Sequence, residues 1–317
     1  MSSAEGYEAA ARRGADWLLS RLRPDGGFGE TDLACYYKAP AALGLAGHPR
    51  QARRLLEVAV ERFGTPEGDF VTAEGVKSAN PVFQEFWCYP NGWLALAAHR
   101  LGWFGVAHQA YRHLLTYRTG DGGFSANDAG VPDAISTAHL GLLALTLGDL
   151  DTARAAGDWL TKLLVTQPHL ATGFHLRADE HGPRTADDSP LHVLRTGAPD
   201  QPYFMIGYPL AYLTRLHQLG GDPAHLTAAI GYADYALSCG EHLRSTPFSH
   251  KVGWGAAILA RHGHDARHRD LATGIADHLV SLQAEDGSWS PDGPAYATFD
   301  DTAEITHWLL EIAAELP

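Results

Sequence analysis

Two pairs of adjacent titratable side chains, Asp300–Asp301 and His250–Lys251, are the residues of this sequence best suited to acid–base chemistry. Neighbouring carboxyl groups disfavour each other's ionised form, so one of the two aspartates is expected to keep a proton and act as an acid. His250 or Lys251 would remove a proton or polarise a carbonyl group. Glu85, in a Phe- and Trp-rich segment, is a further candidate acid because its surroundings would partly desolvate it.

Each pair also has a structural interpretation. Asp300 and Asp301 come directly before an apolar stretch, where aspartates cap helices and are favoured by free N–H groups. His250 and Lys251 would in that case form an ion pair with a neighbouring acid. The sequence alone leaves both interpretations open.

Aromatic side chains near these groups predict an apolar substrate cavity, although aromatics are also common in ordinary protein cores. The residues expected to bind substrate are Tyr36, Trp87, Tyr89, Tyr203, Trp254 and Asp133.

The elements that must position these residues recur about every 50 residues as pairs of helices. The first member of each pair is amphipathic, with apolar residues at i, i+3 and i+4. The predicted amphipathic helices are 7–22, 50–63, 104–117, 150–165, 223–239 and 265–283. The second member is apolar nearly all round, which is typical of a helix buried on every side. The predicted buried helices are 32–46, 83–101, 133–147, 203–219, 249–262 and 301–316.

Six outer–inner pairs predict an all-α fold, a single (α/α)6 toroid over residues 1–317. Short Gly- and Pro-containing links follow the inner helices, and long loops precede them, so the long loops are expected at one mouth. Alternating residues between glycines predict short β-hairpins at 68–75 and 173–182. The long segment 166–200 is predicted to be a lid, or otherwise a solvated surface excursion.

The amino-acid composition limits the classes of partner that the protein is expected to bind. The chain is 45% hydrophobic and 19% charged, as in ordinary globular proteins, and its net charge of -13 argues against nucleic acid or anionic membranes. Three widely spaced cysteines, no apolar leader and no apolar run long enough to span a membrane predict a cytoplasmic protein. Its oligomeric state is not readable from the sequence.

The segment from Gln283 to Trp289, QAEDGSW, fits a Q-x-x-x-G-x-W repeat, and the turns at 23–29 and 119–125 are degenerate copies. In these residues the chain resembles the terpenoid cyclase and prenyltransferase β-subunit toroids. The resemblance implies the toroid fold, and it implies that the repeat ties the end of an outer helix to the following turn.

Two finer resemblances concern chemistry. The segment 298–303, TFDDTA, is similar to the D-x-D-D-T-A acid motif of class II terpene cyclases, which implies that Asp300 protonates an alkene or epoxide; Thr298 replaces the first Asp. The segment 32–36 resembles the zinc-binding region of prenyltransferase β-subunits. The segment 86–89 resembles the W-C-Y segment of lanthionine cyclases. The alternative that they imply is a metal site built from Asp32, Cys35, Cys88 and His139.

We expect a cofactor-independent, metal-free cyclase of natural-product biosynthesis, acting on a small hydrophobic polyketide or isoprenoid intermediate. Because the acid motif is incomplete, dehydration or enolate chemistry is favoured over the alternative, a class II terpene-cyclase-like protonation. A carbohydrate epimerase, lyase or hydrolase is a second alternative, since paired acids and aromatic platforms would suit it. A non-catalytic toroid that binds a ligand is the third.

Overall fold

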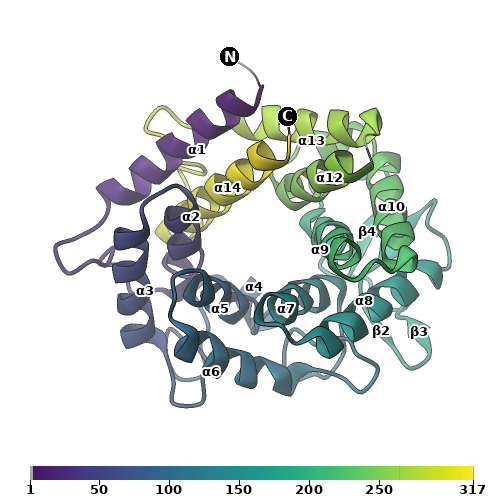
Figure 1. The fold of residues 1–317 in the computed structure, drawn as a ribbon, viewed down its shortest axis with the longest axis horizontal. Coiled ribbons are helices and arrows are strands. Elements are labelled where there is room, and N and C mark those ends of the chain that lie inside the picture. Colours follow the sequence, from purple (N-terminus) through teal and green to yellow (C-terminus); the bar gives the residue numbers. More distant parts are fainter. Residues whose placement is uncertain (1–2, 264, 317) are drawn as a thin grey trace. The chain divides into compact units, whose positions relative to one another are not determined.

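The computed structural model describes residues 3–263 and 265–316, which are helices and loops with four short strands (Figure 1). Its contacts separate two compact units, Met1–Tyr117 with Leu282–Leu310, and Arg118–Ser281 with Glu311–Pro317. The single domain predicted from the sequence stays a prediction beside this division into two units.

The first unit holds the N-terminal helices and most of the last helix. Its elements are α1 (Ser3–Ser20), the 3₁₀ turn η1 (Leu33–Cys35), α2 (Ala39–Leu45), α3 (Pro49–Phe63), α4 (Val82–Glu85), α5 (Tyr89–Arg100), α6 (Phe104–Leu114), the 3₁₀ turn η2 (Leu115–Tyr117) and α14 (Ala295–Glu315).

The second unit holds the middle of the chain. Its elements are α7 (Ala134–Leu147), α8 (Leu150–Val165), β1 (Gly173–His175), β2 (Ala178–Asp179), β3 (Gly182–Pro183), β4 (Val193–Arg195), α9 (Phe204–Gly220), α10 (Pro223–Ser238), α11 (Glu241–Arg244), the 3₁₀ turn η3 (Pro247–Ser249), α12 (His250–Gly263) and α13 (Ala266–Ser281).

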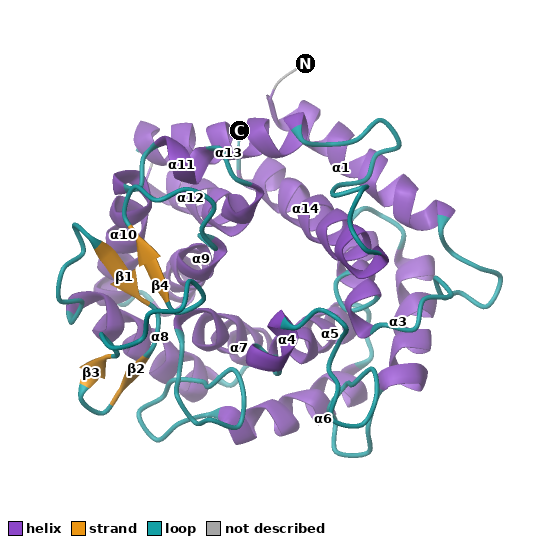
Figure 2. Cartoon of the chain, turned by 180° about the vertical axis from the view of Figure 1, so that it is seen from behind, coloured by secondary structure: helices purple, strands orange, loops and turns teal. Residues whose placement is uncertain are grey.

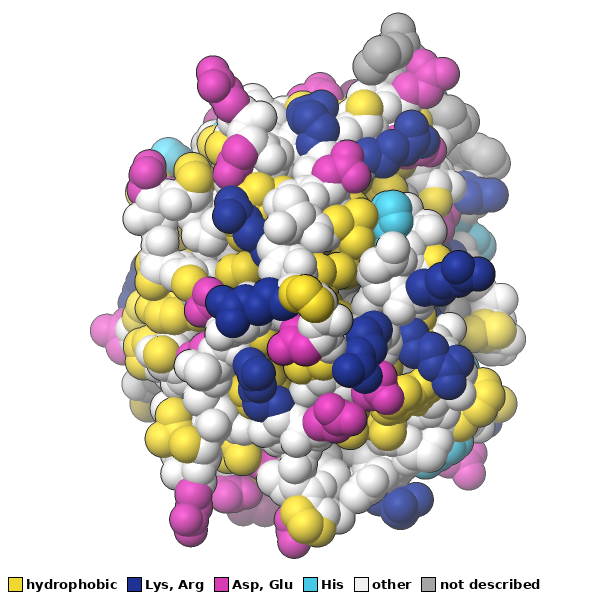
Figure 3. Space-filling view, turned by 90° about the vertical axis from the view of Figure 1, so that its left-hand side faces the viewer, with side chains coloured by type: hydrophobic (Ala, Val, Ile, Leu, Met, Phe, Trp, Pro, Cys, Tyr) yellow, Lys and Arg dark blue, Asp and Glu magenta, His cyan; other side chains and the backbone are white. Residues whose placement is uncertain are grey.

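The contrast between amphipathic and fully apolar helices is confirmed by burial. In α5 every residue from Tyr89 to Ala98 is buried, whereas α3 buries a single stripe that includes Leu55, Leu56 and Phe63. The exposed face of α3 carries charged side chains, and acidic and basic groups are interspersed over the side of the molecule shown in Figure 3. The outer helices therefore present solvated faces and the inner helices supply the core.

Three predicted inner helices have different limits. The segment 32–46 is broken into η1 and α2, and 83–101 into α4 and α5, because prolines at 40 and 90 favour a new helix start. The prediction that a helix begins at Asp301 is wrong: α14 starts at Ala295, so Asp300 and Asp301 lie inside the helix rather than at its N-terminus.

The repeat turns at 119–125 and 283–289 and a further turn at Gly68 have a common geometry, whereas a Cβ atom at Gly26, in the 23–29 turn, would meet the Arg54 side chain. Gly68, Gly122 and Gly287 all have positive φ, and a Cβ atom at each would lie 2.6–2.8 Å from a backbone carbonyl oxygen of an outer helix. These positions therefore require glycine for both backbone conformation and space. The side chain of Gln283 donates hydrogen bonds to the carbonyl groups of Ala10 and Gly287, which is the tie that the Q-x-x-x-G-x-W repeat implies.

Segment 166–200 contains the strands (Figure 2). β2 and β3 form a hairpin within the predicted 173–182 region, while β1 pairs antiparallel with the later strand β4. The β1–β4 ribbon packs on α10, since the ring of Phe174 lies 5.4 Å from that of Tyr232. At 68–75 the structure shows two isolated bridges instead of a hairpin, one between Gly64 and Phe70 and one between Ala73 and Val76. Within 3–263 and 265–316 none of the helices is both long and apolar enough to cross a membrane.

Candidate functional site

The candidate site of the first unit forms around one face of α14. Asp300 and Glu304 are four residues apart, so helical geometry places both on this face, one turn apart. Between their carboxyl groups lies Lys38, which comes from the loop between η1 and α2. The Nζ atom of Lys38 is 2.7 Å from Oδ1 of Asp300 and 2.5 Å from Oε2 of Glu304. The sequence analysis did not single out Lys38.

Lys38 is held in an aromatic enclosure and is almost fully buried. Its ammonium lies 4.9 Å from the ring centre of Tyr37, 5.9 Å from that of Tyr89 and 6.0 Å from that of Trp93. The negative faces of these rings favour a cation. Burial lowers the pKa of Lys38, but the carboxyl groups of Asp300 and Glu304 outweigh burial, and the net pKa is raised. Lys38 is therefore an ammonium at neutral pH.

One ammonium cannot compensate two buried carboxylates, so the group of three favours keeping one proton. Glu304 is the better stabilised anion, because Trp308 Nε1 donates to its Oε1 atom at 3.0 Å in addition to the contact with Lys38. Burial raises the pKa of Asp300 to about 7; Lys38 opposes this shift, and Glu304 and Asp301 add to it. Asp300 is consequently the carboxyl group in this group of three that holds a proton up to about neutral pH.

The two oxygens of Asp300 have different surroundings. Oδ1 is buried in contact with the Lys38 ammonium, so Oδ2 is the oxygen on which a transferable proton would sit. The neighbouring phenol of Tyr37 is fully buried, and burial together with Asp300 raises its pKa well above the ordinary value. Asp300 thus has one oxygen fixed by a cation and one able to deliver a proton.

Asp301 lies on a different face of α14. Its Oδ2 atom accepts a hydrogen bond of 2.5 Å from Ser290, and Thr298 donates to the Ser290 carbonyl group at 2.8 Å. Both side chains therefore fasten the helix to the preceding turn. Neither aspartate is an N-cap, since the helix begins five residues before Asp300.

The other residues predicted for this unit have varied surroundings. Tyr89 contributes to the enclosure of Lys38. The hydroxyl group of Tyr36 is occupied by the 23–30 turn, because it donates to the Glu30 carbonyl and accepts from the Phe28 amide. Glu85 is half-buried at the end of α4. Binding of substrate by Tyr36 and proton transfer by Glu85 remain predictions.

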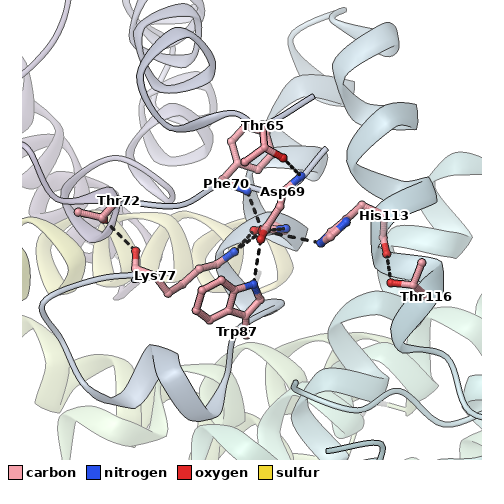
Figure 4. Close-up of polar contacts among 9 residues, drawn as sticks. Thr65, Asp69, Phe70, Thr72, Lys77, Trp87, His113 and Thr116 are labelled. Atoms are coloured by element: carbon pink, nitrogen blue, oxygen red, sulfur yellow. Dashed lines mark hydrogen bonds and ion pairs between the residues drawn. The ribbon is translucent and has the colours of Figure 1, made fainter. Parts of the chain in front are cut away.

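A second polar cluster, centred on Asp69, was not anticipated from the sequence (Figure 4). Asp69 accepts hydrogen bonds from Lys77 at 2.5 Å, from Asn91 at 2.7 Å and from Trp87 Nε1 at 2.9 Å. Lys77 has no exposed surface, and its burial lowers its pKa to about 8 despite Asp69. The predicted substrate-binding residue Trp87 therefore has its indole N–H fixed by Asp69, and the cluster anchors the 64–80 loop to the start of α5.

In the second unit, His250 and Lys251 form one arrangement with Phe204. The His250 Nδ1 atom lies 2.7 Å from the Pro247 carbonyl oxygen, so Nδ1 carries the hydrogen and Nε2 accepts from Lys251 Nζ at 2.9 Å. The ammonium lies 5.0 Å from the ring centre of Phe204. Both ring nitrogens of His250 are engaged, which describes a neutral imidazole.

Three further predicted residues of this unit are placed by local contacts. Trp254 packs edge-on against Tyr208, with ring centres 5.8 Å apart. Asp133 caps α7 by accepting from the Ser136 amide at 2.8 Å, and Tyr203 donates to the Ala198 carbonyl at 2.7 Å. Contact of these residues with substrate stays a prediction.

Among the residues of the metal-site alternative, Asp32 and His139 are engaged in other contacts, and Cys35 and Cys88 are buried. Asp32 accepts from the amides of Ala34 and Ala79 and from Ser78, and burial raises the pKa of Cys35 far above its ordinary value. His139 Nδ1 lies 2.6 Å from the Tyr208 hydroxyl oxygen. Throughout the described ranges, no three His, Cys, Asp or Glu side chains are grouped so that they could hold a metal ion.

Sequence comparison identifies one curated relative of interest. No family model matches the chain. Over 186 residues it is 31% identical to drimenyl diphosphate synthase from Streptomyces showdoensis, an alignment that covers 56% of this chain and 34% of that protein. The alignment thus spans about a third of the length of this relative.

Solved structures share the fold over nearly the whole chain. The structure of type II terpene cyclase MstE from Scytonema with its product, merosterolic acid A, has a TM-score of 0.64 at 15% identity, covering 99% of both chains. The α-1,6-mannanase GH76A of Salegentibacter sp. HEL1_6, with α-1,6-mannotriose, has a TM-score of 0.67 at 15% identity, covering 98% of this chain and 99% of that one. The predicted all-α fold of the terpenoid cyclase-like toroids is confirmed.

Proposed function

We propose that this protein is a protonation-initiated terpene cyclase whose acid is Asp300. The Oδ2 side of Asp300 gives its proton to one carbon of a terminal alkene in a linear isoprenoid, forming a C–H bond and a carbocation. Internal alkenes then attack the cation to form rings, and loss of a proton to water ends the sequence. No group other than this proton leaves the substrate in these steps. Asp300 regains its proton from solvent.

The observation that carries the proposal is a largely buried Asp300 carboxyl group whose Oδ1 atom lies against the Lys38 ammonium. At neutral pH an ordinary aspartate is ionised and has no proton to give, whereas Asp300 has a pKa of about 7. Once the proton leaves, the carboxylate is stabilised by the Lys38 ammonium at 2.7 Å from Oδ1. A preset cation at the position where negative charge develops lowers the barrier to transfer.

An isoprenoid substrate is favoured over a polyketide by the comparisons. The relative with 31% identity is named for a terpenoid diphosphate product, and one MstE structure holds geranylgeranyl dihydroxybenzoate as substrate. MstE and the mannanase, at 14–15% identity, each share only the fold with this chain, so the preference for an isoprenoid rests mainly on the curated relative. The aromatic side chains of Tyr37, Tyr89 and Trp93 around Lys38, the ion-pair partner of Asp300, suit an apolar chain and a developing cation.

Thr298 is compatible with this role. Residues 298 and 300 lie in one continuous helix, about 200° apart around its axis, so the side chain at 298 faces away from the Asp300 carboxyl group. Thr298 is occupied instead by the turn at Ser290. For this reason we replace dehydration or enolate chemistry, which the incomplete motif favoured, by alkene protonation.

The experiment is cyclisation in deuterated water. The protein is incubated with linear prenyl diphosphates and with geranylgeranyl dihydroxybenzoate, and products are analysed by mass spectrometry and NMR. We expect a cyclic product that has gained one deuterium at the protonated carbon. Asp300→Asn should abolish the product, whereas the matched variant Asp301→Asn should retain most activity.

A cyclic product without deuterium would mean that ring formation starts by another route, and full activity in Asp300→Asn would remove Asp300 from the mechanism. An α-1,6-linked mannan serves as the competing substrate. Its hydrolysis in the absence of any isoprenoid cyclisation would replace the proposal by a glycosidase.

A further inference from the structure

We infer that Glu304, acting through Lys38, is the positioning residue that keeps the proton on Asp300. This inference rests on the proposed function for its consequence in turnover, but the proton itself can be measured without any substrate. Glu304 is not part of the acid motif that the sequence resembles.

The geometry makes Lys38 a shared partner. Its ammonium contacts Asp300 on one side and Glu304 on the other, and its side chain is 3% exposed. If Glu304 were neutral, the ammonium would have Asp300 as its nearest counter-charge, and ionisation of Asp300 would give a balanced buried pair. Because Glu304 is an anion already in contact with the ammonium, ionising Asp300 instead leaves an excess negative charge in a buried site.

Helix geometry explains why the residue at position 304 can supply this charge. It lies one turn beyond Asp300 on the same face of α14, in contact with Lys38 and Trp308. The side chain at position 298 faces the Ser290 turn instead. The charge that sets the protonation of the acid is therefore supplied four residues after it, rather than two residues before it.

The groups that face this site come from three elements. The Leu33–Cys35 turn and the residues after it supply Cys35, Tyr37 and Lys38; α5 supplies Tyr89 and Trp93; and α14 supplies Asp301, Glu304, His307 and Trp308. Lys38 lowers the pKa of Asp300, whereas Glu304 and, more weakly, Asp301 raise it. Removing Lys38 and removing Glu304 should therefore shift the midpoint of the Asp300 titration in opposite directions.

The test is an NMR titration of protein labelled with carbon-13 at the aspartate side-chain carboxyl group. Asp300→Asn identifies the Asp300 signal by its disappearance. In Glu304→Gln, which keeps the size of the side chain, we expect the midpoint to fall by about one to three pH units. In Lys38→Met we expect it to rise. The same Glu-to-Gln change at the exposed position 61, on α3, should leave the midpoint unchanged.

Turnover gives a second readout. If Glu304 acts only through the proton, Glu304→Gln should lose activity at neutral pH and recover it as the pH is lowered, which a purely structural defect would not allow. An Asp300 midpoint in Glu304→Gln that equals the wild-type value would overturn the inference, and so would a rise. Should Lys38→Met fail to fold, the direction of the Glu304→Gln shift still decides.

The two proposals fail in different ways. If the NMR midpoints shift as expected but no isoprenoid is cyclised, the charge relation stands and the cyclase function falls. If the wild type cyclises with incorporation of deuterium but Glu304→Gln has an unchanged midpoint, the cyclase function stands and the role of Glu304 falls.

Discussion

Asp69 and Lys77, eight residues apart in the loop between α3 and α4, form a salt bridge of 2.5 Å in which the lysine has no exposed surface. Breaking a buried pair by removing one partner leaves an uncompensated charge. We expect Lys77→Met to lower the free energy of unfolding by about 3 kcal/mol, measured by urea denaturation. Lys162→Met, a matched change at an exposed position, should alter it by less than about 0.5 kcal/mol.

A double-mutant cycle tests whether the two residues act as a pair. Asp69→Asn combined with Lys77→Met should cost less than the sum of the single changes, because no unpaired charge remains. Additive losses would show that each residue stabilises the loop separately, through Asn91 and Trp87.

The Asp300 carboxyl group predicts a pH-dependent stability. Its pKa rises from 3.8 in the unfolded chain to about 7 in the folded protein, so its contribution is full below pH 3.8 and is lost as the pH rises to 7. Asp300→Asn mimics the protonated acid at every pH. We therefore expect this variant to gain stability relative to wild type between about pH 4 and 7, with a constant difference above pH 7.

Thermal unfolding at a series of pH values measures this gain. Asp151→Asn is the control for the chemical change itself, since the Asp151 side chain is fully exposed. A difference between Asp300→Asn and wild type that is independent of pH would contradict the raised pKa of Asp300.

The geometry at Gly287 predicts how much stability the protein loses when this turn glycine is replaced. Its φ is +92°, and a Cβ atom would lie 2.6 Å from the carbonyl oxygen of Arg13 on α1. Gly287→Ala should destabilise the protein by about 1–3 kcal/mol, measured by denaturant unfolding. Gly274→Ala is the matched control: that glycine is inside α13, and a Cβ atom there would be in ordinary van der Waals contact with the Arg244 side chain, at 3.9 Å. Alanine there should stabilise the protein by about 0.5–1 kcal/mol. Equal effects at the two positions would contradict this account.

The contacts of His250 predict which ring nitrogen carries the hydrogen. Donation from Nδ1 to Pro247 and acceptance by Nε2 from Lys251 require a neutral ring with its hydrogen on Nδ1. Nitrogen-15 NMR of the imidazole should show that form at neutral pH. In Lys251→Met the neighbouring cation is gone, so the ring should take up a second proton at higher pH than in the wild type. A ring protonated at both nitrogens in the wild type at neutral pH would rule out the arrangement.

Periodicity in the sequence predicted the parts of the fold that depend on local burial. A run such as 89–98 is apolar on every side, and only a helix surrounded by other helices can bury it. Helix limits were predicted less well where a proline or a turn decided them. The start of α14 at Ala295 is the clearest case, because the residues at 295–300 carry no apolar period of their own.

For the candidate site, the sequence by itself proposed Asp300 among several acids and bases, because an acidic pair next to an apolar helix is visible in one short segment. It could have drawn attention to Lys38, the one basic residue in the otherwise apolar stretch 33–46. Only the tertiary structure decided the chemistry. The contact of Lys38 with residues more than 260 positions away along the chain, and the burial that raises the pKa of Asp300, arise from packing between distant segments, and no local pattern encodes either.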